Sequence, residues 1–197
     1  MINRTVMAED QIQRTNQIIS SIENLQKLDF ATLTQRPDPK QWSIIEVIGH
    51  MNSAYYLYEA RLDQKLQELP ASNESEEPFK VGRKTAFFIR AITPQGSKRP
   101  MKMKTMKVFE PVFTIEELDA EKIEGVFNTF FNYKKHLKSS IQKARSKAVN
   151  HSKINSALGP LVKFYLPEAF EFLIGHDERH LVQIAEIQAA ITQNVSV

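Results

Sequence analysis

The chain has 197 residues, of which 42% are hydrophobic and 25% are charged. This length suffices for one domain with a sizeable core and is short for two, and the composition is typical of a folded globular protein, not of a disordered or membrane class. The net charge of +3 comes from 26 basic and 23 acidic residues, which is weak grounds for a polyanionic partner. We therefore expect a single domain over residues 1–197, with no nucleic-acid or membrane partner.

The absence of cysteine limits the chemistry that the chain can perform. It excludes disulfides, thiolate metal ligands and a cysteine nucleophile, so any metal must be held by nitrogen and oxygen atoms. The N-terminal residues turn polar at Glu9-Asp10-Gln11, so we predict no signal peptide. No apolar run approaches the roughly 20 residues that span a bilayer. The resulting expectation is a cytoplasmic protein.

Two long helices are predicted in the first third of the chain. Apolar residues recur at helical spacing from about residue 10 to 28, and Pro37 and Pro39 exclude a continuation through residues 29–41. A second helix follows Ser43, which has Glu46 three residues later in the pattern of a capping box. This helix is expected to run to about residue 69 and to stop at Pro70.

The middle of the chain is rich in residues that interrupt helices and strands. Residues 71–79 form a polar sequence, and residues 81–92 predict either a short helix or an irregular apolar segment,. Residues 93–113 contain three prolines and a glycine, which excludes a long regular element. We expect an excursion over about residues 70–113, lying across one end of the fold.

Two more helices are predicted in the second half. The segment from Glu116 to about Lys147 has helical periodicity,. After Gly159-Pro160, Pro167 is well placed as the first residue of a last helix that ends near Thr192. Four long helices without a convincing alternating strand predict an all-α fold. The expected architecture is an antiparallel four-helix bundle over about residues 10–192, in which facing helices can build a metal site.

Three of the five histidines carry the functional prediction. His176 and His180 are four residues apart in the last predicted helix, about 400° of rotation, so both imidazoles leave the same face. His50, in the second helix, would complete a three-histidine site if the two helices pack side by side. Burying each imidazole in these apolar surroundings without a partner would cost on the order of 1–3 kcal/mol, which metal coordination would offset. The alternative is that the histidines are hydrogen-bonded core residues.

A three-histidine site leaves coordination positions open for water or substrate, as catalytic sites do, whereas closed structural zinc sites usually have four protein ligands. The zinc-protease helix needs a glutamate directly after its first histidine. Here Asp177 occupies that position, and Glu178 points about 200° away from His176. A metalloprotease is therefore disfavoured. His136, on a basic helix face, and His151, in a polar loop, are both predicted to be solvated.

Glu46 lies one turn before His50 and has two possible roles. It can accept a hydrogen bond from the ring nitrogen of His50 that does not face the metal, as carboxylates beside metal sites often do. Alternatively, it only completes the capping box with Ser43. The sequence leaves the two readings equal. Trp42 is predicted to be a packing residue at the start of the same helix, with stacking on a substrate as the alternative.

The segment Lys98–Lys107 carries five positive charges in ten residues. Its place between the second and third long helices could bring it over the mouth of the histidine site. There it would attract an anionic thiol cosubstrate or a carboxylated substrate. A solvated basic loop is the commoner explanation for such a run, so the segment alone does not identify a ligand.

Two motifs resemble those of a known family. Trp42-Ser43-x-x-Glu46-x-x-x-His50 and His176-x-x-Arg179-His180-Leu181-x-Gln183-Ile184 resemble the DinB-like family of four-helix-bundle metal proteins, which includes YfiT-type hydrolases and bacillithiol transferases. The order of elements fits as well, so the similarity covers about residues 10–190. The resemblance implies a divalent ion, commonly nickel or zinc, bound by His50, His176 and His180 with waters completing the shell. It also makes a homodimer plausible.

The resemblance further implies the kind of chemistry to expect. Characterised relatives transfer a low-molecular-weight thiol to an electrophile or isomerise a substrate with thiol assistance, and others are called hydrolases. We therefore expect a metal-dependent thiol S-transferase or hydrolase in which the ion activates a thiol or water. Since the chain has no cysteine, a thiol would be a cosubstrate. A non-catalytic metal- or small-molecule-binding stress-response protein and a dimerisation scaffold without chemistry remain as alternatives.

Overall fold

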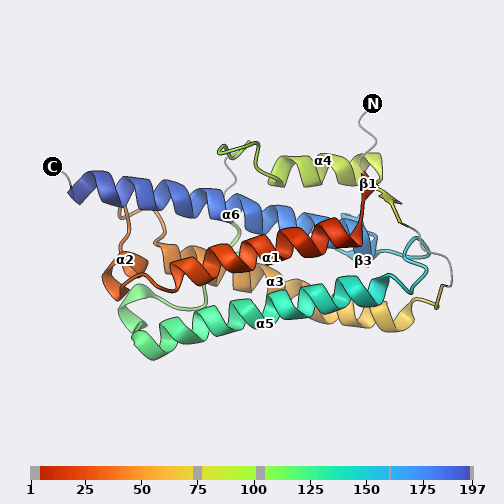
Figure 1. Cartoon of the computed structure of the whole chain (residues 1–197), viewed down its shortest axis with the longest axis horizontal. Helices are drawn as coiled ribbons and strands as arrows, with labels where there is room; N and C mark the ends of the chain where they lie inside the picture. The colour runs from red at the N-terminus through yellow and green to blue at the C-terminus, as the bar shows by residue number, and fades with distance from the viewer. Residues whose placement is uncertain (1–4, 73–76, 101–104, 160, 196–197) are drawn as a thin grey trace.

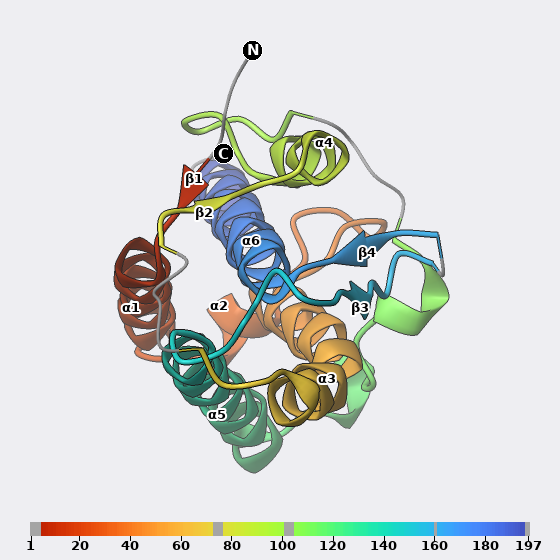
Figure 2. The same ribbon diagram turned by 90° about the vertical axis from the view of Figure 1, so that its right-hand side faces the viewer.

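The computed structural model describes residues 5–72, 77–100, 105–159 and 161–195. Four long helices pack around the core (Figure 1), and they are α1 (Ala8–Leu25), α3 (Ile44–Glu68), α5 (Ala120–Ala144) and α6 (Leu166–Val195). Viewed along their axes, α1, α5, α3 and α6 surround the core, and a shorter helix, α4 (Arg83–Ile92), lies outside α6 (Figure 2). The predicted all-α class is confirmed.

The remaining elements are short. They are α2 (Phe30–Thr34), the 3-10 turns η1 (Lys107–Phe109) and η2 (Ile115–Glu117), and four two-residue strands, β1 (Thr5–Val6), β2 (Phe79–Lys80), β3 (Ile154–Asn155) and β4 (Lys163–Phe164). β1 pairs with β2 and β3 pairs with β4, both antiparallel. The sequence predicted no strands, because two residues are too few to produce a recognisable alternation of apolar and polar positions.

The directions of the four long helices differ from the prediction. The Ala148 amide donates to the Pro70 carbonyl at 3.0 Å, so the C-terminal ends of α5 and α3 lie together. The Gln11 side chain donates to the Pro167 carbonyl at 2.9 Å, so α1 and α6 begin at the same end. The helix α3 therefore runs parallel to α5 and antiparallel to α6 (Figure 1). The predicted antiparallel arrangement thus holds for α3 and α6 but not for α3 and α5, because the long excursion after α3 carries the chain back along the bundle before α5 begins.

Helix boundaries follow local capping. Ser43 caps α3 as predicted, whereas α5 begins four residues later than expected, because the Asp119 side chain accepts from the Lys122 amide at 2.8 Å,. Asp29 caps the unpredicted helix α2 in the same way, with 2.8 Å to the Thr32 amide. The helix α6 begins at Leu166, so Pro167 occupies its second position.

A buried carboxylate fixes α4 against α6. Glu168 accepts hydrogen bonds from the Gly82 amide at 2.8 Å and the Thr85 hydroxyl at 3.1 Å, both at the start of α4, and from the Tyr165 amide at 3.0 Å. A negative charge at a helix N-terminus is favourable. Of the two readings of residues 81–92, the helix is the one found. The attachment of α4 to α6 determines where the segment after α4 crosses α6.

The Glu46 carboxylate is buried at the start of α3. It accepts from the amide and hydroxyl of Ser43 at 2.8 and 2.9 Å and pairs with the Arg36 guanidinium. Although burial opposes the shift, the hydrogen bonds from Arg36 and Ser43 lower the pKa of Glu46 below its usual value. Since the folded-state pKa is depressed, this stabilisation is present above the unfolded pKa and is lost as the pH falls through the folded one.

We expect Glu46→Gln to lower the free energy of unfolding by about 1–2 kcal/mol at neutral pH. Urea titrations at neutral pH and at a pH below the folded-state pKa should find that this deficit shrinks at the lower pH, where the wild-type carboxylate is protonated as well. Glu23→Gln, at an exposed position of α1, serves as the control. A deficit of equal size at both pH values would contradict the role assigned to the charge.

Candidate metal centre

The three predicted histidines converge between α3 and α6. The Nε2 atom of His180 lies 3.0 Å from Nε2 of His50 and 3.2 Å from Nε2 of His176. His50 and His180 are buried, and His176 is partly exposed. One nitrogen from each ring lies within 4.8 Å of the others, an arrangement that could hold a metal ion. The predicted proximity is found, and the role of the three side chains as ligands remains a prediction.

The separations between the ring nitrogens suit a shared ion. Zinc–imidazole bonds are about 2.0–2.1 Å long, so two such ligands at angles between 90° and 110° place their nitrogens about 2.9–3.4 Å apart. The observed separations of 3.0 and 3.2 Å fall in this range. These two separations are therefore compatible with ligands of one ion.

The hydrogen bonds behind the rings determine where their lone pairs point. Nδ1 of His50 lies 2.6 Å from the carbonyl oxygen of Phe109, which can only accept, so Nδ1 carries the proton and Nε2 a lone pair. Nδ1 of His180 faces Oε1 of Gln183 at 2.9 Å in the same way. Two lone pairs then oppose each other at 3.0 Å. A cation between them removes this repulsion.

Protons are poor candidates for that cation. Burial lowers the pKa of His50, His176 and His180, and the neighbouring imidazoles lower the pKa of His176 and His180 further. The three rings are therefore neutral near pH 7, the state in which imidazole binds metals. The donor set, three neutral nitrogens without a thiolate, suits zinc, nickel, copper or iron better than magnesium or calcium.

The Glu46 carboxylate does not accept a hydrogen bond from the ring of His50. Its carboxylate is engaged by Ser43 and Arg36, and the ring of His50 donates to Phe109 instead. Of the two predicted roles for Glu46, the structure contains the capping box. The group that accepts the hydrogen bond from His50 is the main-chain carbonyl of Phe109, 59 positions along the chain. Such a partner leaves no signature in the residue types.

Two glycines allow other segments to pack beside the histidines. A Cβ atom at Gly49 would lie 2.7 Å from the Phe113 ring, and one at Gly175 would lie 2.6 Å from the Thr93 hydroxyl. Real Cβ atoms essentially never approach another atom this closely. Gly49 directly precedes His50, and Gly175 directly precedes His176. The excursion therefore contacts both helices at the histidine site because these positions lack a side chain.

Gly175→Ala should cost about 1–3 kcal/mol of unfolding free energy, the range for overpacking. The Thr93 hydroxyl cannot move away freely, since it donates to the Ile89 carbonyl at 2.7 Å. Adding Thr93→Ala should recover part of the loss, whereas adding Thr93→Ser should not. Thermal unfolding of the three variants tests this. Equal effects of the alanine and serine substitutions at position 93 would exclude the hydroxyl as the obstacle.

A buried ion pair adjoins the histidines. Lys134 of α5 pairs with Asp177 of α6, and the two side chains are only 1% and 3% exposed. The ammonium also lies 4.8 Å from the centre of the Tyr55 ring, a cation–π contact. Burial raises the pKa of Asp177, whereas the Lys134 charge opposes that shift. The sequence did not lead us to predict the burial of Lys134.

The other two histidines have separate environments. His136 is partly buried, with Nδ1 2.9 Å from the Tyr55 hydroxyl and Nε2 3.0 Å from the Asp63 carboxylate. The prediction that it is solvated was wrong, because α3 packs alongside this face of α5. His151 is exposed, as predicted. Glu178 points away from the cluster and pairs with Arg14 of α1, which agrees with the predicted direction of its side chain.

A cavity of about 1090 Å³ opens beside the three histidines. Trp42 lines it, with its ring centre 5.1 Å from that of His50. This position agrees with packing and leaves the Trp42 ring accessible to a ligand. Lys98 and Arg99 of the basic segment also line the cavity, so these two residues lie where the prediction placed them. Residues 101–104 lie outside the described part of the chain.

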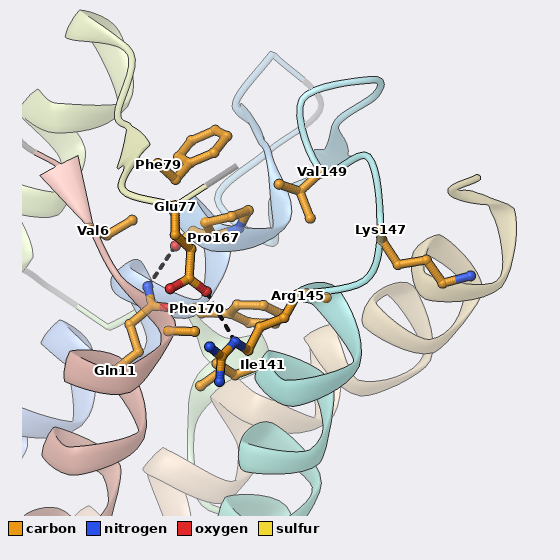
Figure 3. A pocket seen from close by; sticks show the side chains of 12 residues that line it. Val6, Gln11, Glu77, Phe79, Ile141, Arg145, Lys147, Val149, Pro167 and Phe170 are labelled. Carbon is orange, nitrogen blue, oxygen red and sulfur yellow. Dashed lines mark hydrogen bonds and ion pairs between the residues drawn. The ribbon is translucent and has the colours of Figure 1, made fainter. Parts of the chain in front are cut away.

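A second cavity lies near the start of α1 and α6 (Figure 3). It is bordered by Gln11, Pro167 and the ion pair between Glu77 and Arg145, whose charged atoms are 3.4 Å apart. Its volume of about 30 Å³ is enough for about one water molecule,. Of these two cavities, only the one beside the histidines has room for a substrate.

These features define a class: a mostly helical protein in which two facing helices bring together three neutral imidazoles that could hold a metal ion. The chain matches the family model of the DinB superfamily over residues 11–184 and belongs to that superfamily. The resemblance inferred from the two motifs is thus confirmed. Searches among curated proteins and among solved structures found no match. Within the described residues, no helix has the length and apolar character needed to cross a membrane.

Proposed function

We propose that this protein is a divalent-metal-dependent enzyme in which His50, His176 and His180 hold the ion, with zinc or nickel as the expected metals. The observation that carries the proposal is the 3.0 Å separation of the buried Nε2 atoms of His50 and His180, whose lone pairs we infer to face each other. Two neutral imidazoles held in this way are strained without a cation and relaxed with one.

The proposed chemistry is thiol S-transfer, as in bacillithiol transferases, or hydrolysis. A metal ion held by three imidazoles lowers the pKa of a thiol or water and so supplies a nucleophile at neutral pH. The chain itself contributes orientation: the Phe109 carbonyl keeps the proton of His50 on Nδ1, and the Gln183 side chain does the same for His180. The thiol would be a cosubstrate, because the chain has no cysteine.

The size of the adjoining cavity favours an enzyme over a protein with a structural ion. A structural site is closed by its protein ligands, whereas about 1090 Å³ of space reaches these histidines. The space is of the size found for small-molecule sites. A substrate and a thiol could therefore both reach the ion.

The direct test is metal-dependent turnover. Purified protein loaded with zinc or nickel is assayed for transfer of a low-molecular-weight thiol to 1-chloro-2,4-dinitrobenzene and for hydrolysis of ester and amide substrates. We expect one activity that disappears on chelation and in His176→Ala, but not in His151→Ala. An activity that survives chelation unchanged would overturn the proposal. A metal-loaded protein inactive in both assays would favour the non-catalytic binding protein.

A further inference from the structure

The large cavity extends along the axis of α6, so the residues that line it can be assigned to positions along that helix. Phe172 precedes the two histidines of this helix and Glu186 follows them, and both line the cavity. At 1.5 Å per residue, these two positions are roughly 21 Å apart along the helix axis. The two histidines lie between them, four and eight residues after Phe172. A ligand occupying this length would have one part on each side of the metal centre.

One end of the cavity is apolar. Ala54 and Tyr58 follow His50 by one and two turns of α3, and since α3 runs antiparallel to α6, they face residues before His176. The ring centres of Tyr58 and Phe172 are 6.4 Å apart, which confirms that Tyr58 lies beside a residue that precedes His176 in α6. The Tyr58 hydroxyl is occupied by Ser156, at 2.8 Å. The space here therefore presents mainly carbon atoms to a ligand.

The wall from the histidines toward the other end is cationic. Lys40, Lys98, Arg99 and Arg179 all line the cavity. Among the described residues of its wall, Glu186 is the one carboxylate, and it already pairs with Arg99. This excess of positive charge is specific to the cavity wall, because acidic and basic residues are nearly balanced in the whole chain.

Arg179 is the cation closest in sequence to the histidines. It directly precedes His180 and is only 4% exposed. Arg99 lines the same cavity, so the two guanidinium groups can bind one anion there. A guanidinium also matches the two oxygens of a carboxylate or phosphate with two parallel hydrogen bonds.

We propose that the substrate is an amphipathic anion whose carboxylate or phosphate is bound by Arg179 and Arg99 and whose apolar portion lies against Tyr58 and Phe172. This orientation brings the bond that reacts to the level of the histidines. The inference rests on the proposed function, since it names the class of substrate for the same site. Both the head and the tail are required, so a small inorganic anion or a neutral alkyl chain binds weakly.

Trp42 provides the readout for a binding experiment. It is the only tryptophan in the chain, and it lines the cavity beside His50, so its fluorescence reports ligands there. The probes are decanoate, decyl phosphate, decanol, acetate and inorganic phosphate. Each is titrated into metal-loaded protein and into chelated protein, because a carboxylate could also bind the metal directly.

We expect decanoate or decyl phosphate to bind at least ten times more tightly than decanol, acetate or inorganic phosphate, in both forms of the protein. The stronger of the two decyl anions identifies the head group. Equal binding of decanol would overturn the cationic head site. Equal binding of acetate or inorganic phosphate would overturn the apolar tail site. Binding of the decyl anions only to metal-loaded protein would make the metal, not the arginines, the head-group ligand and would also overturn the proposal.

Variants locate the head group. Arg179→Gln should weaken decyl-anion binding at least tenfold and leave decanol binding unchanged. Arg99→Gln is the second variant, should Arg179→Gln fail to fold. Lys84→Gln, an exposed cation on α4, is the matched control. If Lys84→Gln weakens binding as much as the arginine variants do, the attraction is general and the site is wrong. The metal content of each variant is measured in parallel. It distinguishes weaker binding caused by the loss of an arginine from weaker binding caused by the loss of the metal ion.

Discussion

Lys134→Met is expected to lower the free energy of unfolding by about 3–5 kcal/mol, because removing one partner of a buried ion pair leaves the other charge without compensation. Asp177 is 3% exposed and would face the apolar interior alone. Methionine retains most of the length of the lysine side chain, so the loss is electrostatic more than steric. Urea-induced unfolding, followed by circular dichroism, measures the effect.

The neighbouring residue supplies a matched control for this prediction. Lys135→Met changes the same residue type one position along α5, where the side chain is exposed, and should alter stability by about 0.5 kcal/mol or less. The double variant Lys134→Met, Asp177→Leu should recover most of the loss, since apolar pairs often replace buried ion pairs at little cost. If Lys134→Met is as mild as Lys135→Met, the ion pair is not buried as described.

Metal binding should raise the melting temperature of the chelated protein substantially. A ligand present at a thousand times its dissociation constant stabilises the folded state by about 4 kcal/mol, which for a chain of this size corresponds to roughly 8–16 °C. The stabilisation requires the three imidazoles, so His50→Ala, His176→Ala or His180→Ala should abolish the shift. Differential scanning fluorimetry with and without zinc or nickel measures it.

The control for this prediction is the exposed histidine. His151→Ala removes a potential metal ligand far from the cluster in sequence and should retain the full shift. A shift that persists in the His176→Ala variant would mean that the ions bind elsewhere. An absence of any shift in the wild-type protein, at metal concentrations that do not precipitate it, would count against the three-histidine site.

Local signals predicted the long helices well. Ser43 and Glu46 marked the start of α3 because a capping box is formed by residues close in sequence,. The relative directions of the helices could not be predicted in this way. They depend on the excursion between α3 and α5, whose contacts, such as that of Thr93 with Gly175, join distant parts of the chain.

The burial of Lys134 was not predicted, although the sequence contained a signal for it. Phe127, Phe130, Leu137 and Ile141 are buried, and position 134 falls on the same stripe at intervals of three and four residues,. Residue type favours exposure for a lysine, whereas the periodicity indicates burial at this position. A buried lysine needs an anion, and the facing helix offers Asp177. Reading the stripe first would therefore have predicted both the burial and the need for a carboxylate.

The site was predictable in part. The spacing of His176 and His180 placed both rings on one helix face, whereas the meeting with His50 depended on how α3 and α6 pack. The Phe109 carbonyl had no signal in the residue types. The cavity and its charged wall arise from four separate segments, so their positions follow from the fold rather than from any motif.

Elemental analysis of protein purified without a histidine tag, alongside the His176→Ala variant, tests the central claim most directly. The account predicts about one divalent ion per wild-type chain and its loss in the variant. A wild-type protein that is metal-free and takes up neither zinc nor nickel at micromolar concentration would contradict it. The three histidines would then be hydrogen-bonded residues of the core.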